Sequence, residues 1–279
     1  MSKKTKKRVQ NNSKTTNLFV ERFKQRLHTA KTPLSTKNHI KTRYGYIEGY
    51  QKNNMTQFKG IPYAKAPLGP LRFRAPKEPD SWEGVLETKT LAPEAIQAES
   101  NALDDLIDSG QKRTFSEDCL YLNIYTPKCD QKKRAVLFWI HGGALMIGSA
   151  NAYQNPDWVK EQDIVLVTIN YRLGIFGFLN DQEDPESDYN IGFLDQLKAL
   201  KWVNEHIHLF GGDPNNITLF GESAGAWSIS AHLASKKSEG LFQKAILQSG
   251  VLMPNSLNND GISRKIGETS VDVPSGNVG

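Results

Sequence analysis

One serine in the chain stands between two glycines at a spacing of two residues, in the stretch FGESAGAWSIS that covers residues 220–230. This Gly-x-Ser-x-Gly pattern is typical of a sharp strand-to-helix turn that exposes the serine hydroxyl as a nucleophile for acyl transfer. Such a reaction also needs a base that removes the hydroxyl proton, and N–H donors that stabilise the negative oxygen that develops. Ser223 is therefore a candidate nucleophile, and the alternative is an ordinary tight turn in which the serine only caps a helix.

The residues on both sides of Ser223 favour the nucleophile. Residues 216–220, NITLF, predict a buried strand, and residues 224–235 have the alanines and the absence of proline expected of a helix. Glycine is needed at positions 221 and 225 for a steric reason, because a serine in a strained backbone conformation leaves no room for β-carbons two residues away. The helix would also point its free N–H groups at the reacting centre.

A second stretch, WIHGGALMIGS at residues 139–149, could supply donors for the negative oxygen. A predicted strand ends at His141, and two glycines then let the backbone turn with its N–H groups exposed. Backbone donors placed in this way stabilise an oxyanion by about 3 to 4 kcal/mol each. The alternative is a plain glycine-rich loop, but a position about 80 residues before the Gly-x-Ser-x-Gly stretch favours the oxyanion role.

No residue of the chain is predicted to be the base. Of the 56 residues after Ser223, only His232 is a histidine, and it lies nine positions along the same predicted helix. At 1.5 Å and 100° per residue it would be roughly 13 Å away on the opposite side. The other histidines are expected to be surface or packing residues: His28, His39, His141, His206 and His208. The acid and the histidine of a triad are therefore not assigned in this chain.

The positive charge of the chain is concentrated at one end. Residues 1–43 hold 13 Lys and Arg and one acidic residue, whereas the remainder holds 22 basic and 29 acidic residues. We expect residues 1–43 to be a basic, disordered or partly helical arm on an acidic body. A nucleic-acid contact, an anionic-membrane contact or a transit peptide is less favoured than a solvated extension, because aromatic interleaving and repeated basic motifs are absent.

Composition gives further limits. The longest apolar runs, AVLFWI and IVLV, are far shorter than the roughly 20 residues that span a bilayer, so membrane insertion is not expected. Cys119 and Cys129 flank a predicted strand that is too long for a disulfide to bridge, so both are predicted to be free thiols of a cytoplasmic protein. No cofactor and no metal site is predicted.

Alternating apolar runs and one clear helix predict an α/β fold. Runs at residues 120–126, 135–140, 163–171, 216–220 and 244–249 read as strands, and apolar residues at three-to-four spacing over 193–207 predict a helix that Gly211 and Gly212 end. YGYIEGY and TQFKGIPYA, residues 44–50 and 56–64, predict an antiparallel hairpin.

These motifs together resemble the type-B carboxylesterase and cholinesterase family of α/β-hydrolases. The resemblance rests on FKGIPYAKAPLGPLRFRAP, SEDCLYLNIYTP, WIHGGA, NYRLGIFGFL, FGESAGAWS and AILQSG, in family order over residues 44–250. It implies that Ser223 is acylated and that the N–H groups of Gly143, Ala144 and Ala224 form the oxyanion hole. Glu222 matches a family glutamate near the active site, where it is either a structural hydrogen-bond acceptor or a direct catalytic part.

The resemblance also implies structural features and departures. Internal ion pairs are expected between Arg172 and Asp195 and between Arg72 and Glu117. Ala144 replaces a third glycine of many relatives, which leaves a backbone donor in place. Relatives carry a cysteine at the position of Ala95, and it forms a disulfide with the cysteine at the position of Cys119. With Ala95 the resemblance implies no such disulfide in this chain.

Family members are much longer, and their acid and histidine come from strands after the stretch matching AILQSG. We therefore expect an α/β-hydrolase fold with a mostly parallel sheet, cut after the strand that follows the nucleophile helix, with residues 251–279 as an unmatched polar tail. The implied function is hydrolysis of small-molecule carboxylic esters through a serine acyl-enzyme, with this chain an inactive fragment. The alternative is a non-catalytic carboxylesterase-like binding module, less favoured because such members usually lose the serine.

Overall fold

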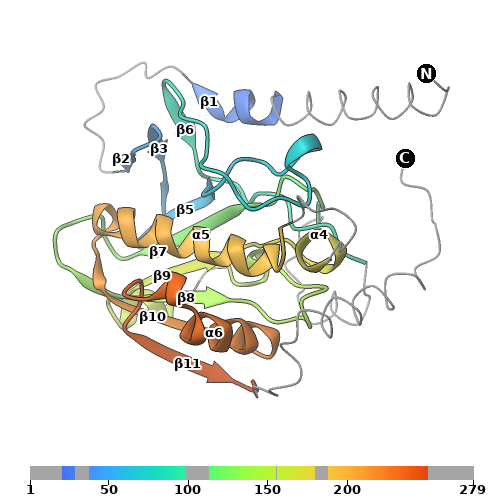
Figure 1. Cartoon of the computed structure of the whole chain (residues 1–279). Coiled ribbons are helices and arrows are strands. Elements are labelled where there is room, and N and C mark those ends of the chain that lie inside the picture. The colour runs from blue at the N-terminus through green and yellow to red at the C-terminus, as the bar shows by residue number, and fades with distance from the viewer. Residues whose placement is uncertain (1–20, 29–37, 99–112, 155, 180–187, 251–279) are drawn as a thin grey trace.

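The fold is seen in a computed structural model that describes residues 21–28, 38–98, 113–154, 156–179 and 188–250. Its centre is a seven-stranded sheet of order β11-β10-β8-β9-β7-β5-β4 (Figure 1). Four neighbouring strands are parallel: β8 (Arg134–Ile140), β9 (Val165–Ile169), β10 (Gly212–Glu222) and β11 (Lys244–Gln248). The others pair antiparallel: β4 (Tyr50–Lys52), β5 (Met55–Pro62) and β7 (Tyr121–Thr126). The predicted α/β fold with a mostly parallel sheet is confirmed.

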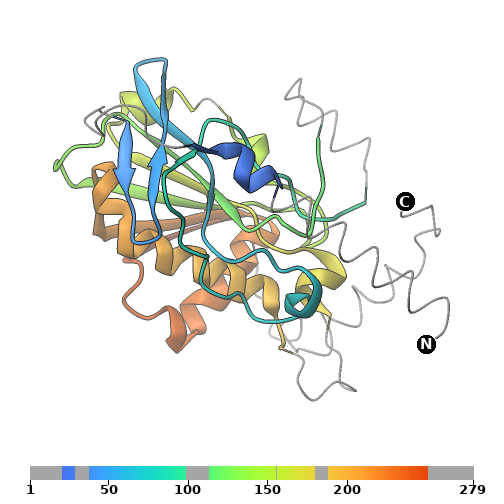
Figure 2. The ribbon, with the colours of Figure 1, turned by 90° about the horizontal axis from the view of Figure 1, so that it is seen from above.

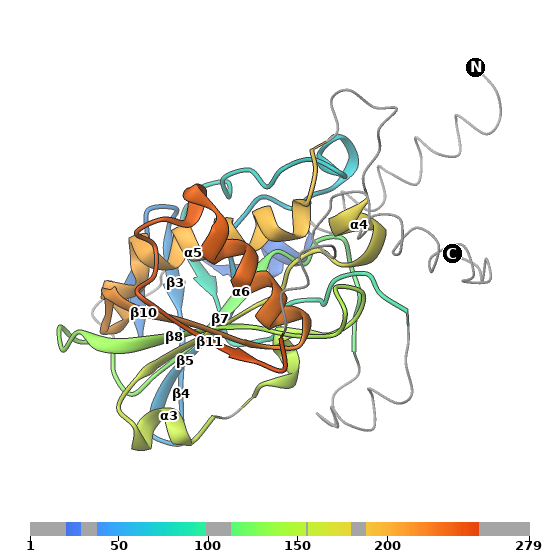
Figure 3. The same ribbon diagram turned by 60° about the horizontal axis from the view of Figure 1, so that its bottom comes forward.

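Helices cover both faces of this sheet, as Figure 3 shows. α5 (Ile191–His206) and α6 (Ala224–Ala234) lie on one face, and α3 (Trp158–Glu161) lies on the other. The short α4 (Gly174–Phe178) packs against α5. The chain leaves α5 through a 3-10 turn, Ile207–Phe210, that ends at Gly211 with φ +80°, where the glycine pair was predicted to stop the helix.

A second, four-stranded sheet has the order β1-β6-β3-β2 and corrects the predicted hairpin. It contains β1 (Leu27–His28), β2 (His39–Lys41), β3 (Tyr46–Glu48) and β6 (Val85–Glu87). Residues 46–48 therefore do not pair with β5. Of the predicted first strand only Tyr50, the first residue of β4, pairs with β5, and β4 and β5 are joined by a turn at Asn53 and Asn54 with φ of 52° and 58°. The switch occurs at Gly49, where a β-carbon would lie 2.7 Å from the Phe58 ring. The prediction of one continuous strand over residues 44–50 is wrong, because tight packing at Gly49 makes the chain pass from one sheet to the other.

The second sheet lies near the end of α5 that His206 marks (Figures 1 and 2). The ring of Tyr44 is 5.8 Å from that of His206, and the backbone N–H of Arg43 donates to His206 Nε2 at 3.4 Å. A short helix over residues 21–26 leads into β1, and Arg26 donates to the carbonyl oxygen of Gly60 at 2.7 Å. This part of the basic segment thus packs on the body, whereas residues 1–20, 29–37 and the tail 251–279 lie outside the described residues.

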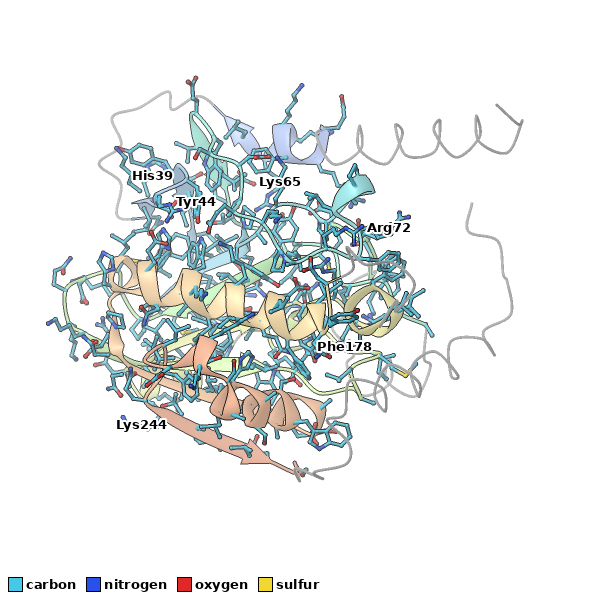
Figure 4. All side chains as sticks on the ribbon, viewed as in Figure 1. His39, Tyr44, Lys65, Arg72, Phe178 and Lys244 are labelled. Atoms are coloured by element: carbon cyan, nitrogen blue, oxygen red, sulfur yellow. The ribbon has the colours of Figure 1, made fainter. Side chains whose placement is uncertain are left out.

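The two ion pairs that the resemblance implied are present, one buried and one partly exposed. Asp195 is fully buried and accepts hydrogen bonds from Arg172 Nη2 at 2.6 Å and from Nε at 2.7 Å. Arg72, labelled in Figure 4, pairs with Glu117 at 2.5 Å. Cys119 and Cys129 are free thiols. No helix within the described ranges has the length and apolar character of a membrane span.

Strand β11 forms one edge of the main sheet, and among the described residues nothing pairs with its outer side. Ile246 is 47% exposed and Leu247 38% exposed. An unpaired strand edge with exposed apolar side chains is a template for association between chains. We therefore expect the purified 279-residue chain to exceed monomer size in light scattering and to bind hydrophobic dyes.

Ile246→Lys should reduce both signals, because a lysine on an edge strand opposes further pairing. Trp158→Lys is the matched control, since Trp158 is 41% exposed on α3, and α3 contacts β7, which is separated from β11 by three strands in the sheet. A monomeric wild-type chain without dye binding would contradict this expectation.

Candidate active site

Ser223 occupies the turn between β10 and α6 in a strained conformation. Its φ is 53° and its ψ is −120°, outside the regions that L-residues ordinarily adopt. Its backbone N–H donates to the carbonyl oxygen of Gln248 at 2.8 Å, so the end of β11 holds the turn. The side chain is half-buried and does not cap α6. This geometry fits an exposed nucleophile and does not fit a serine that only caps a helix.

The two glycines beside Ser223 are required by close backbone contacts with β8. A β-carbon on Gly225 would lie 2.0 Å from the carbonyl oxygen of Ile140, and one on Gly221 would lie 2.7 Å from the same oxygen. Glycine was predicted here from strain at the serine itself. The structure adds that Ile140, the last residue of β8, fills the space where these β-carbons would lie. This contact connects the Ser223 turn to the residues that follow β8, and residues 142–148 are called the oxyanion loop.

The oxyanion loop begins with a tight turn. Gly143 has φ of 104°, and a β-carbon on it would lie 2.1 Å from the carbonyl oxygen of Ile147. Ala144 and Leu145 follow in left-handed conformations, with φ of 54° and 63°. The carbonyl oxygen of Gly143 accepts the N–H groups of Met146 at 2.9 Å and Ile147 at 3.0 Å, which closes the turn.

The loop lies directly beside the serine. A β-carbon on Gly142 would lie 3.3 Å from Cβ of Ser223 and 2.8 Å from Oε2 of Glu222. Within the described residues, no acceptor binds the backbone N–H groups of the three predicted donors, which are Gly143, Ala144 and Ala224. These groups remain available to a negative oxygen next to Ser223.

Glu222 is exposed and places its carboxylate at Gly142, on the loop side of Ser223. Burial and the nearby Glu222 carboxylate raise the pKa of Tyr153 above its ordinary value. Glu222 thus lies on the exposed side of the turn, between Ser223 and Gly142. This position is compatible with both roles considered for it, a structural hydrogen-bond acceptor and a direct participant in catalysis.

His141 supports the loop from inside. Its ring stacks on Tyr171 with centroids 4.4 Å apart, and Nδ1 lies 2.8 Å from the carbonyl oxygen of Gly142. A carbonyl oxygen only accepts, so Nδ1 carries the proton. The Tyr171 hydroxyl also donates to the carbonyl oxygen of His141 at 2.8 Å. Tyr171 was not singled out from the sequence, because no local pattern marks a tyrosine that packs beneath a loop 30 residues away.

Acidification should weaken the fold through His141. Burial lowers the pKa of His141 to about 4, whereas an unfolded histidine titrates near 6.5. The neutral ring is thus favoured in the native state, so stability is complete above pH 6.5 and falls as the pH drops toward 4. The shift corresponds to about 3 kcal/mol, which His141→Phe should remove from the pH dependence of urea unfolding. The wild-type chain is the reference, and an unchanged pH dependence in His141→Phe would contradict the prediction.

The remaining histidines have other partners or positions. His232 is buried and contacts Oε1 of Gln196 at 3.0 Å and Oγ of Ser238 at 3.1 Å. His206 stacks on Trp202 with centroids 4.4 Å apart. His206 is the last residue of α5 and His208 lies in the 3-10 turn after it, at the edge of the sheet where β10 begins, opposite to Ser223. His28 and His39 belong to the second sheet. In the described ranges no group of three or more His, Cys, Asp or Glu side chains could hold a metal.

Comparison with known proteins places this geometry in a family. The chain is 45% identical over 214 residues to para-nitrobenzyl esterase of Bacillus subtilis, covering 76% of this chain and 43% of that protein. It is 43% identical over 231 residues to liver carboxylesterase 1 of Oryctolagus cuniculus, covering 79% and 40%. The chain therefore spans about two-fifths of the length of these curated relatives.

Solved structures agree with the sequence comparison. The Geobacillus stearothermophilus carboxylesterase EST55 at pH 6.2 superposes with a TM-score of 0.68 at 46% identity, over 76% of this chain and 43% of that one. A structure titled thermophylic PNB esterase gives 0.72 at 39% identity, over 83% and 51%. The model of the carboxylesterase family matches residues 36–271. The chain belongs to the carboxylesterase family.

Proposed function

We propose that this chain carries the nucleophile and the oxyanion hole of a carboxylic ester hydrolase. The observation that supports this most is Ser223 at φ 53° beside a loop with unsatisfied N–H donors. The Ser223 hydroxyl attacks the ester carbonyl carbon, and its proton passes to a base. The carbonyl oxygen becomes negative and is stabilised by the N–H groups of Gly143, Ala144 and Ala224. The tetrahedral intermediate then expels the alcohol, and water releases the acid from the acyl-serine.

We propose that the base is none of the six histidines of this chain. The contacts of His141, His206 and His232 and the positions of the other three support this. More than half of the length of the relatives has no counterpart here, since the chain covers 43% of the Bacillus subtilis esterase. We propose that an acid and a histidine of an equivalent segment complete the triad. We also propose a cytoplasmic setting, supported by the two free thiols.

A chimera tests the function. Residues 1–250 of this chain would be joined to the part of the Bacillus subtilis esterase that has no counterpart here, and hydrolysis of para-nitrophenyl acetate and butyrate would be followed. We expect turnover that Ser223→Ala lowers on the order of 10⁶-fold. Ser230→Ala is the matched control, because Ser230 lies on the same helix and its hydroxyl, among the described residues, donates only to the carbonyl oxygen of Ala226. A well-folded but inactive chimera, or one that Ser223→Ala leaves active, would exclude the proposed role.

A further inference from the structure

The side-chain amide of Gln97 makes four hydrogen bonds, three of which join two distant parts of the backbone. Its Oε1 accepts the N–H of Gly148 at 2.8 Å, and its Nε2 donates to the carbonyl oxygen of Gly148 at 2.9 Å. Nε2 also donates to the carbonyl oxygen of Ala95 at 3.1 Å. Gln97 therefore ties Gly148, the last residue of the oxyanion loop, to the segment around Ala95.

Arg113 fixes which way this amide points. Its Nη2 donates to Oε1 of Gln97 at 3.2 Å, and because a guanidinium only donates, the oxygen must face it. Arg113 is held in turn by Glu94, at 3.0 Å from Nε and 2.7 Å from Nη2, and its Cζ lies 4.9 Å from the ring centroid of Phe115. The Glu94 side chain is only 5% exposed. The orientation of the Gln97 amide is therefore fixed by two donors, the N–H of Gly148 and the guanidinium of a largely buried ion pair.

Gly148 transmits this anchoring to the start of the loop. It has φ of 108°, and a β-carbon on it would lie 2.6 Å from both the carbonyl oxygen of Gly142 and Nδ1 of His141. The two ends of the loop are thus in direct contact. A shift of Gly148 would displace Gly142, which itself lies beside Cβ of Ser223.

From these contacts we propose that Gln97 is a positioning residue of the oxyanion hole, oriented by Arg113. It touches no reacting atom and acts by holding the loop so that the N–H groups of Gly143 and Ala144 face the oxygen of the carbonyl that Ser223 attacks. Its effect on catalysis rests on the proposed esterase function, whereas its effect on the loop does not.

Hydrogen exchange on the full 279-residue chain tests the effect on the loop. The informative amides are those of Met146 and Ile147, which bond to Gly143 and not to Gln97. Gln97→Ala should speed their exchange at least tenfold, measured residue by residue, if the amide positions the whole loop. Gln51→Ala is the control, because Gln51 lies on β4 at one edge of the main sheet and bonds there to Thr56 Oγ1 at 2.7 Å and to Asn38 Oδ1 at 3.2 Å. Unchanged exchange at Met146 and Ile147 in Gln97→Ala would overturn the proposal.

A second pair of variants tests how Arg113 acts. Arg113→Ala should speed the same two amides, but should add nothing in a chain that already carries Gln97→Ala, because its action passes through Gln97. An additive effect would overturn the role given to Arg113. Gln97→Glu keeps both acceptor contacts and loses both donor contacts, so it should give intermediate exchange, and it serves in place of Gln97→Ala if that variant does not fold.

The chimera described above adds a kinetic readout. There Gln97→Ala should lower kcat about 10- to 100-fold with little change in KM, because a misplaced oxyanion hole affects the transition state more than the bound ester. A change in KM alone would contradict positioning of the oxyanion hole. An inactive chimera with Gln97 intact would contradict the proposed function, and exchange at Met146 and Ile147 would still decide the effect on the loop.

Discussion

The 279-residue chain alone should hydrolyse para-nitrophenyl esters on the order of 10⁴ to 10⁶ times more slowly than the chimera, the range by which triad knockouts slow a serine hydrolase. Without a base, the Ser223 hydroxyl stays protonated and is a weak nucleophile, although its turn and the oxyanion loop are in place. The measurement is initial rates with purified chain and chimera at equal concentrations, corrected for spontaneous hydrolysis.

Three variants of the chain alone make this result interpretable. Ser223→Ala in the chain alone identifies any turnover that uses the nucleophile, and His232→Gln and His141→Phe test whether a histidine of the chain serves as base. Turnover of the chain alone near that of the chimera, abolished by Ser223→Ala, would show that the base lies within these residues. Loss of that turnover in one histidine variant would identify it.

Asp195→Ala should lower the free energy of unfolding by about 3 to 5 kcal/mol, the largest stability effect expected for the chain. The substitution leaves the guanidinium of Arg172 without its carboxylate, and Arg172 is only 3% exposed. Among the described residues the guanidinium then keeps the carbonyl oxygen of Arg74 at 2.9 Å, which carries no compensating charge. Urea unfolding followed by circular dichroism would measure the difference.

The matched control is Asp80→Ala. Asp80 pairs with Lys65 at 2.8 Å, but its side chain is 69% exposed, so the loss should stay within about 0.5 kcal/mol. Asp195→Asn keeps the shape and one acceptor oxygen, and should fall between the two if Asp195→Ala does not fold. Equal effects of Asp195→Ala and Asp80→Ala would show that the buried pair contributes no more than a surface pair.

The parts of the candidate site that lie within one contiguous stretch were predictable. Residues 216–235 contain a β-branched run, a glycine-flanked serine and an alanine-rich run, and each of these sets backbone conformation locally. The strand β10, the turn at Ser223 and the helix α6 appear in that order. The same holds for α5, which the three-to-four spacing of apolar residues predicts, and for the parallel strands, which continuous apolar runs predict.

The predicted hairpin failed at a point where local pattern and packing differ. Residues 44–50 alternate like one strand, yet β3 and β4 enter different sheets on either side of Gly49. The alternation continues through the glycine, so nothing in the pattern marks the change. The change is set by the Phe58 ring, nine residues further along the chain, which occupies the space beside Gly49.

The sequence by itself determined the parallel strands, the serine turn with its helix, and the free thiols, because sterics and periodicity act on residue type and spacing, while the charge pairs were implied by the family resemblance. Only the tertiary structure decided which distant groups support the site: Ile140 against Gly225, Gln248 at the Ser223 N–H, and Gln97 at Gly148. These contacts involve backbone atoms that every residue carries, or an amide that bonds equally well in many places. Their partners are therefore fixed by the order of strands in the sheet and by the close packing of its ends.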